Sequence, residues 1–570
     1  MNGFSISIGL NGKTIKSGET QISEHDFIEY EDITLKNLSN GKFENDNLFL
    51  ETPDYIIVLK GVILNKKDLL GPSLDWEKTV IESYRKEGNG FFKKFRGSFC
   101  GAFYDKKEGK WIVFTDHIGS KALYYYKKDE IFFISSKISE IYSFLKENKL
   151  AYSLDMLSAY NLLIYGYMLD DGTLCGDIRK ILPGNYLCIQ DGSVETTNYY
   201  KLPNSKFEEK VNEDEIIETL DFKFREAIRL QFDKDREYSY KHLVTLSGGL
   251  DSRMVSWVAH EMGYTDQINL TFSQSDYLDE SIAKKIAADL KHEWIFKALD
   301  NGNFLKDIDE ITEISGGHAL YHGLAHSRSV YKYINSDILG MTHSGQLGEV
   351  VIGSNITRLE KKDLKTLGGR YSNTMENKNP TRTHFKSFED LELAMLYQRG
   401  FNGANEGLKI GQINSETMSP FYNVDFWEYC RSIPLKNRMN HRIYLKWVLS
   451  KYPKAANYKW EKIKAKPSVN RFTLNYKGRE IPIKKLPSVT FQKLGLKSSP
   501  KLTKNHMNPL GYWYNTNNDL RTFQDTYFKE NIDRIIDGNL KSDCKRLYYS
   551  GNGVERNQAL TLLSAIRLNF

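Results

Sequence analysis

The sequence predicts a multidomain protein of the α+β and α/β classes: an antiparallel β-sandwich with helices, then a parallel α/β domain, then a helical C-terminal extension. Three observations support this fold class. A chain of 570 residues is too long for one hydrophobic core. Short apolar runs separated by turn residues dominate the first ~200 positions. Beyond them, apolar runs of strand length alternate with helical patterns.

The first domain is predicted to span residues 1–205. Its short β-like runs are typical of packed antiparallel sheets, because turn residues separate each run from the next. The charged stretch 201–215 is expected to be a linker or to lead into a helix. The predicted strands are 55–59, 101–104, 111–114, 123–126, 131–134 and 185–189.

The second domain is predicted to span residues 206–480 and to contain a parallel sheet. Strands that alternate with helices form such sheets, and ligands bind at the carboxyl ends of the strands. Residues 481–570 are rich in Lys and Asn and become helical near 557–568, so they form the predicted extension. The predicted strands of the sheet are 243–246, 268–272 and 338–341, and one helical face comprises Ile282, Ala283, Ile286, Ala287 and Leu290.

A glycine-rich loop, residues 247–252, directly follows the first of these strands, and a helical pattern follows the loop. Free backbone N–H groups and a helix N-terminus bind anions, most often phosphate. Gly248 and Gly249 allow a close approach to the anion, and Ser247 and Ser252 add donors. Asp251 would repel an anion, which indicates a magnesium ion between carboxylate and phosphate. The alternative is a tight turn of small polar residues.

Composition narrows the functional classes. A net charge of +6 over this length is too small to indicate nucleic-acid binding. Five cysteines without CxxC spacing argue against a zinc site or a disulfide framework and fit a reducing cytoplasm. The longest apolar stretch, 162–169, is broken by Gly166 and is too short to span a bilayer. We therefore expect a cytoplasmic protein that binds neither nucleic acid nor membrane.

The loop 247–252 resembles the pyrophosphate-binding loop of the asparagine synthetase family, among the PP-loop ATP pyrophosphatases. Further segments resemble motifs of that family in the family order, namely 95–105, 115–125, 182–187, 344–349 and 416–421. The resemblance covers about the first 470 residues. It implies a glutaminase-type, Ntn-hydrolase-like β-sandwich followed by a PP-loop synthetase domain.

The first domain departs from the glutamine-hydrolysing members of that family. Those members use an N-terminal cysteine whose free amine activates its own thiol. Here Asn2 follows Met1, and Lys60-Gly61-Val62 stands where the family has Asn-Gly-Glu. We therefore expect no glutaminase activity and a scaffold role for this domain, as in the β-lactam synthetases. Asp75 is either a retained family carboxylate or a helix N-cap residue.

The second domain retains the residues that the resemblance assigns to adenylation. Asp251 and Glu349 match the magnesium ligands, although the family has the shorter Asp at the second position. Lys462 and Lys466 fall where the family has a lysine that contacts the phosphates, and the alternative for both is solvated surface. The positions that flank the adenosine are Leu246, Phe272 and Gly345, of which Phe272 is equally a candidate core residue.

Acyl transfer to an amine needs a general base. Gln346 stands where asparagine synthetase has a Glu, and an amide cannot accept the proton. Glu416 is therefore the predicted base, with Gln346 as a hydrogen-bonding orienter; the alternative is that Glu416 caps or pairs within a buried helix. Asp279 and Glu280 are expected to stabilise a helix N-terminus, and His343 either contacts substrate or is structural.

Together these features predict an ATP-dependent, AMP-forming carbon–nitrogen ligase that uses ATP and Mg²⁺ and transfers an acyl group to ammonia or an amine. One alternative is an inactive ATP-binding scaffold, since Gln346, Leu347 and Glu349 replace family residues. Others are an amidotransferase working with a separate glutaminase and a tRNA-modifying PP-loop enzyme, for which the catalytic cysteines are missing. Arg253, Gln346 and the extension resemble bacterial paralogues from polysaccharide and peptide natural-product pathways. A homodimer stays open.

Overall fold

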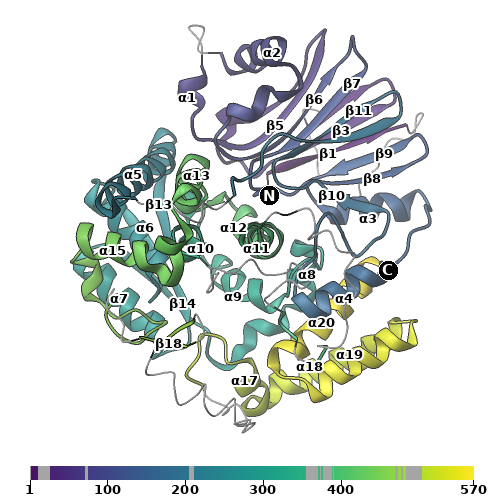
Figure 1. Cartoon of the computed structure of the whole chain (residues 1–570). Coiled ribbons are helices and arrows are strands. Elements are labelled where there is room, and N and C mark those ends of the chain that lie inside the picture. The colour runs from purple at the N-terminus through teal and green to yellow at the C-terminus, as the bar shows by residue number, and fades with distance from the viewer. Residues whose placement is uncertain are drawn as a thin grey trace.

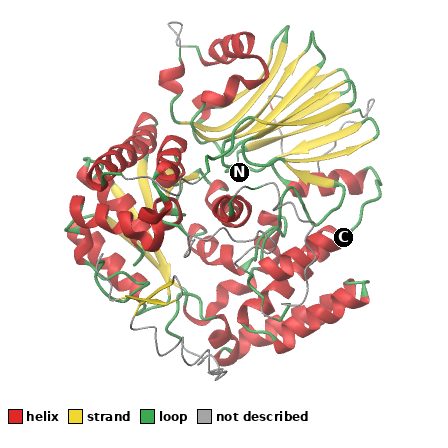
Figure 2. Ribbon diagram, in the orientation of Figure 1, coloured by secondary structure: helices red, strands yellow, loops and turns green. Residues whose placement is uncertain are grey.

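The computed structural model describes a strand-rich N-terminal part and a helix-rich remainder (Figures 1 and 2). The predicted boundary at 205/206 lies outside the described residues. Those residues are 2–9, 26–70, 75–204, 211–354, 370–372, 374–375, 388, 390–468, 473–476, 479–482 and 504–570.

Two antiparallel sheets of six strands each form the N-terminal part, as predicted. Their strand orders are β10-β8-β9-β1-β3-β2 and β12-β11-β7-β6-β5-β4. Phe4 and Ile6 of the first sheet share a buried core with Val58 and Ala102 of the second, so the sheets pack face to face. The strands are β1 (Gly3–Ile8), β2 (Phe27–Tyr30), β3 (Ile33–Leu38), β4 (Leu48–Glu51), β5 (Tyr55–Ile63), β6 (Gly97–Asp105), β7 (Lys110–Thr115), β8 (Tyr124–Lys128), β9 (Ile131–Ser135), β10 (Ile178–Lys180), β11 (Asn185–Gln190) and β12 (Ser193–Asn198).

Helices cover the outer faces of this sandwich. α2 (Trp76–Glu87) packs Trp76 and Val80 into a core with the second sheet, and α3 (Ile138–Glu147) packs against the first sheet. Asp75 is the N-cap residue of α2, because its side chain accepts a hydrogen bond from the Lys78 N–H at 3.1 Å. Its capping role is therefore the alternative that the structure supports. Two further helices of this part are α1 (Lys66–Leu69) and α4 (Met156–Tyr165).

A five-stranded, all-parallel sheet organises the second domain, with the order β15-β14-β13-β16-β17. The three predicted strands are confirmed with ends shifted by one or two positions. α6 begins at Leu250, directly after the glycine-rich loop, and Gly263 follows its last turn with φ +90°. The elements are β13 (Lys241–Thr245), β14 (Gln267–Ser273), β15 (Glu293–Ala298), β16 (Leu339–His343), β17 (Thr417–Met418), α5 (Glu213–Glu237), α6 (Leu250–Glu261) and α7 (Leu278–Leu290).

The C-terminal helices fold back onto the body of the protein (Figure 1). α20 (Gly553–Asn569) starts with a capping box formed by Asn552 and Glu555 and is buried along most of its length. It packs against α4, α8, α18 and α19. The remaining elements are α8 (Ile308–Ser315), α9 (His322–Tyr331), α10 (Gly348–Ile352), α11 (Leu391–Met395), α12 (Leu408–Gln412), α13 (Val424–Ser432), α14 (Leu435–Arg438), α15 (Arg442–Lys451), β18 (Thr473–Tyr476), β19 (Arg479–Pro482), α17 (Leu510–Thr516), α18 (Asn518–Asn531) and α19 (Gly538–Ser550).

All five cysteines are free thiols, and four of them are buried. Among the described helices, none combines the length and the apolar character needed to cross a bilayer.

Several neutral histidines lie in the interior, and we predict that they make the protein acid-sensitive. Burial lowers their pKa values from 6.5, so the unfolded chain takes up protons that the folded chain excludes. The unfolding free energy should therefore fall as the pH drops below 6.5, by up to about 1.4 kcal/mol per pH unit for each group. The pKa falls to about 4 for His117, His292 and His326 and to about 3 for His318 and His322.

Urea unfolding at a series of pH values checks this prediction. His117→Gln is the matched variant, since the His117 Nε2 lies 3.1 Å from the Lys93 carbonyl and the Gln amide can donate to the same oxygen without titrating. The unfolding free energy of this variant should depend less steeply on pH than that of the wild type, because about one proton fewer is taken up on unfolding. If the unfolding free energies of both proteins depended equally on pH, His117 would not contribute to the acid sensitivity.

Candidate functional site

A cavity of about 620 Å³ opens at the carboxyl ends of the parallel strands. We call it the loop cavity, because the loops 247–252 after β13 and 344–349 after β16 form much of its wall. A ligand site at this edge is the position expected for a parallel α/β sheet. The predicted residues that line it are Leu246, Ser247, Gly249, Asp251, Ser252, Phe272, Gly345, Gln346 and Glu349.

The two loops touch each other because glycines leave room for the contact. A Cβ on Gly345 would lie 2.3 Å from the Ser252 nitrogen, and a Cβ on Gly348 would lie 2.6 Å from Asp251 Cγ. Between them Leu347 has φ +64°, a left-handed conformation that is strained for a leucine. The geometry of the second loop is therefore fixed by its contact with the first.

Hydrogen bonds within the first loop use some of the predicted donors. The Gly248 N–H donates to Asp279 Oδ1 at 2.8 Å, and the Ser247 N–H donates to Ser252 Oγ at 3.0 Å. Gly248 is not among the residues that line the loop cavity, and its N–H is already used within this hydrogen-bond network. Asp279 lines the cavity, and burial raises its pKa to about 6. Asp279 thus holds the loop, a role beyond the helix stabilisation that the sequence predicts.

Asp251 and Glu349 meet where the loops touch. Asp251 Oδ2 accepts from the Glu349 N–H at 2.8 Å, and Oδ1 accepts from the Tyr444 hydroxyl at 2.8 Å. Burial, together with the charge of Glu349, raises the pKa of Asp251 to about 7. A carboxylate whose charged form is disfavoured by a neighbouring carboxylate fits a divalent cation with oxygen ligands, which would relieve the repulsion.

Of the two candidate lysines, the structure brings only Lys462 to this point. Its ammonium group pairs with the Glu349 carboxylate and lies 3.4 Å from His441 Nε2. Lys466 is exposed, and its Nζ lies 3.4 Å from Asn457 Oδ1, away from the loops.

Buried Arg253 places the segment that carries Lys462. Its guanidinium donates to the carbonyl oxygens of Gly248 at 3.1 Å and Ala455 at 3.2 Å. The Glu461 N–H also donates to the Gly248 oxygen at 3.1 Å, and Glu461 lines the loop cavity. The segment preceding Lys462 is therefore clamped onto the first loop.

The predicted base, Glu416, lies elsewhere. Its carboxylate is fully buried and lies 2.8 Å from Lys121 Nζ of the first domain, and it does not line the loop cavity. Burial raises the pKa of Glu416 and Lys121 opposes this effect. The structure therefore gives Glu416 a buried partner in the first domain, which favours the alternative of a structural pair over the predicted role as a base. Gln346 does line the cavity and donates to the Ala404 oxygen at 2.6 Å.

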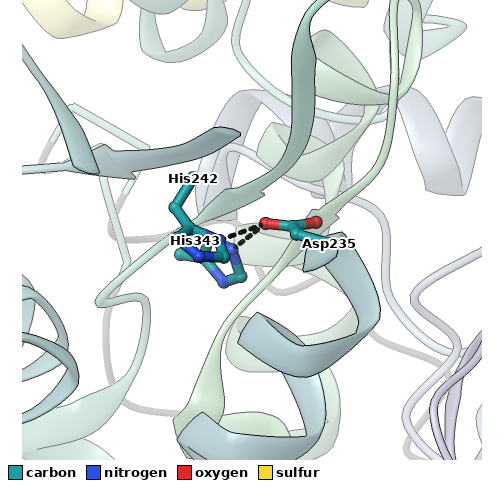
Figure 3. A group of neighbouring side chains, drawn as sticks. All are labelled: Asp235, His242 and His343. Carbon is teal, nitrogen blue, oxygen red and sulfur yellow. Dashed lines mark hydrogen bonds and ion pairs between the residues drawn. The ribbon is translucent and has the colours of Figure 1, made fainter. Parts of the chain in front are cut away.

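His343 is not among the residues that line the loop cavity, and Figure 3 shows it grouped with His242 and Asp235. Its Nε2 and the Nδ1 of His242 lie 2.7 and 2.9 Å from the same oxygen of Asp235 on α5. The three side chains are buried, and their potential metal-ligating atoms lie within 4.8 Å of one another. Because hydrogen bonds already join these atoms, the group ties α5 to β13 and β16. His343 is therefore structural.

The positions that correspond to the glutaminase centre are packed. Asn2 is buried, and its amide donates to Asn47 Oδ1 at 3.0 Å; the Gly61 N–H donates to the same oxygen at 2.8 Å. Lys60 is buried beside them, and burial lowers its pKa to about 8. At these positions Asn2 presents an amide and Lys60 an amine, and neither is a thiol.

Sequence reasoning missed three residues of the site. Tyr444 and Glu461 lie far from the loops in sequence, and no local pattern marks either residue. Arg253 stands out as a departure from the family, but only the structure shows the clamp. The sequence does contain one signal for this clamp, because Arg253 places a charge on the apolar side of α6. A buried guanidinium group needs several hydrogen-bond acceptors, so such an arginine indicates a contact with another segment.

Comparison with known proteins agrees with this architecture. Residues 48–200 match the family model of the glutamine amidotransferase domain, and residues 219–391 match that of asparagine synthase. An amidase of Gibberella zeae, Amidase chry2, is 26% identical over 180 residues, which are 31% of this chain and 25% of that protein. The chain thus spans about a quarter of the length of this curated relative.

Two solved structures are similar over part of the chain. One is the allosteric regulatory enzyme of purine biosynthesis, with 10% identity, a TM-score of 0.23 and coverage of 52% of this chain and 74% of that chain. The other is glutamine phosphoribosylpyrophosphate amidotransferase from B. subtilis in complex with ADP and GMP, with 10% identity, a TM-score of 0.22 and coverage of 60% and 75%.

The fold and the family matches define a two-domain protein in which an amidotransferase-type β-sandwich precedes a parallel α/β domain with a glycine-rich loop. The family models match these two domains in the same order. The chain therefore has an asparagine synthetase-like architecture, with a glutamine amidotransferase domain followed by an asparagine synthase domain.

Proposed function

We propose that the protein is an ATP-dependent, AMP-forming amide ligase that adenylates a carboxylic acid without hydrolysing glutamine. The loop cavity carries this proposal, because it joins a glycine-rich loop, the Asp251–Glu349 pair and Lys462 at one edge of a parallel sheet. Its volume of about 620 Å³ lies within the usual range for small-molecule sites.

In this proposal each part of the wall has one task. Leu246, Phe272 and Gly345 flank the adenosine, and the free donors of loop 247–252 face the pyrophosphate. Asp251 and Glu349 would hold Mg²⁺, which when bound neutralises charge on the phosphate oxygens. Lys462 would leave Glu349 to contact the phosphates.

The reaction has two steps. A carboxylate oxygen of the acid forms a bond to the α-phosphorus of ATP, and the bond to the bridging oxygen breaks to release pyrophosphate. The nitrogen of neutral ammonia or an amine then attacks the acyl carbon, AMP leaves with the electron pair of the broken bond, and the nitrogen loses one proton to solvent. The loop donors and Lys462 stabilise the negative charge of the leaving pyrophosphate.

One observation favours the second candidate, an ATP-binding scaffold. Lys462 pairs with Glu349 in the structure, so one proposed metal ligand is already neutralised by a cation. Acid-dependent exchange of labelled pyrophosphate into ATP separates the two functions. A ligase catalyses exchange with its acid, whereas a protein that binds ATP but shows no exchange across a broad acid panel would be a scaffold.

The nitrogen source gives a further prediction. With MgATP and an accepted acid, ammonia or an amine should support AMP formation, and glutamine should release no glutamate above background. The reason is that Asn2 and Lys60 occupy the positions of the glutaminase centre and neither supplies a thiolate. Glutamate release in step with AMP formation would contradict this reading of the first domain.

A further inference from the structure

A second cavity, of about 410 Å³, adjoins the loop cavity. We call it the side cavity. Four residues line both cavities, namely Gly323, Leu347, Ala404 and Gly407. A molecule in the side cavity would therefore adjoin the loop cavity, in which the proposed function places ATP.

The shared wall is open because it carries two glycines. An ideal Cβ on Gly323 or on Gly407 would meet no atom within 4 Å. Gly407 has helical φ −64° and ψ −25°, so no backbone strain requires a glycine there. The missing side chains leave space at the junction.

The walls of the side cavity are mostly apolar. They include Leu320, Leu324, Val350, Met395 and Leu396, with the rings of Tyr167 and Tyr371. Such walls favour an aliphatic or aromatic body, since each buried CH₂ gains about 0.8 kcal/mol.

The polar groups of the side cavity select for a carboxylate over an ammonium group. None of the described residues lining it is acidic, and Arg399 supplies a positive charge at its exposed side. The Tyr167 hydroxyl and His322 Nδ1 are buried without a hydrogen-bond partner among the described groups. Burial lowers the pKa of His322 to about 3, so its ring is neutral. A free amino acid would leave its ammonium group here without an anion.

We propose that the side cavity binds the acyl part of the acid substrate, and that this acid is an apolar carboxylate without an ammonium group. The inference rests on the proposed function, because it assumes that the loop cavity holds ATP. Arg399 would attract the anion at the entrance, and the carboxylate would face the junction at Gly407.

Three probes test this assignment by ligand-observed NMR with the full-length protein: 4-phenylbutyrate, 4-phenylbutylamine and aspartate. We expect 4-phenylbutyrate to bind, and the amine and aspartate to bind at least about tenfold more weakly. MgATP binding is measured separately on the same protein. MgATP that fails to bind would contradict the proposed function itself, whatever the probes do.

Two filling variants locate the probe. Met395→Trp should weaken 4-phenylbutyrate binding by about tenfold or more and leave MgATP binding unchanged, because Met395 lines only the side cavity. Gly407→Leu should also weaken probe binding by closing the junction. Gly538→Leu, at an exposed glycine in α19 whose Cβ would likewise meet nothing, is the matched control and should bind the probe normally.

Two results would overturn the substrate class while MgATP still binds. One is tighter binding of aspartate than of 4-phenylbutyrate. The other is 4-phenylbutyrate binding that neither Met395→Trp nor Gly407→Leu reduces. The proposed substrate class would be supported if both filling variants lost 4-phenylbutyrate binding and Gly538→Leu retained it.

Discussion

Replacing Asp251 by asparagine is expected to reduce acid-dependent pyrophosphate–ATP exchange by about 10²–10³-fold. The substitution removes one of the two carboxylates proposed to hold Mg²⁺ beside the phosphates. The fold should survive, because Asp251 lines the loop cavity, its pKa is raised to about 7, and asparagine is a neutral side chain of the same shape. Urea unfolding of the variant should match the wild type within about 1 kcal/mol.

Two further variants sharpen this test. Glu349→Gln should show a comparable loss, whereas Glu349→Asp should keep part of the activity because it retains the carboxylate. Asp75→Asn is the control, since Asp75 caps α2 in the first domain and asparagine caps equally well. Near-normal exchange in Asp251→Asn would rule out the metal assignment.

The fold was predictable from sequence where one segment carries its own pattern. β13 and β14 are apolar runs next to a glycine-rich loop or a helix, and both are confirmed within one or two residues. β15 (Glu293–Ala298) escaped prediction, because an edge strand with Glu293 and Lys297 has no continuous apolar run.

The site was predictable where its residues lie in the two loops. Asp251 and Glu349 follow neighbouring strands of one parallel sheet, so the topology brings them together. Lys462 and Lys466 were indistinguishable in sequence, since only the Arg253 clamp decides which lysine faces Glu349. The placement of the two lysines depends on contacts between residues more than 200 positions apart in the sequence, which no local sequence pattern can predict.

Glu416 differs from the lysines, because its sequence motif does indicate a role in catalysis. Its motif resembles a catalytic segment, and the segment does lie at the sheet: the Thr342 N–H donates to the Glu416 carbonyl oxygen at 2.8 Å. The side chain nevertheless faces the first domain, where Lys121 neutralises it. The motif therefore predicts where the backbone lies, whereas the partner of the side chain depends on a contact with the first domain that the motif does not contain.

Breaking this ion pair should cost stability and leave catalysis nearly unchanged. Glu416→Gln leaves the ammonium group of Lys121 buried without its counter-ion, which typically costs about 3–5 kcal/mol. Lys121 is 3% exposed and Glu416 is fully buried, so water cannot replace the lost partner. Urea unfolding should show this loss. Exchange and amide formation, both measured at low temperature where the variant stays folded, should remain within about twofold of the wild type.

A double-mutant cycle with Lys121→Met isolates the interaction. The double variant Lys121→Met/Glu416→Gln removes both charges, so it should recover most of the stability lost in Glu416→Gln. Additive losses in the double variant would mean that the ion pair contributes little. A different outcome would restore the catalytic reading: retained exchange with amide formation lost by about 10²-fold or more in Glu416→Gln would show that this carboxylate reaches the substrate in a conformation other than the one described here.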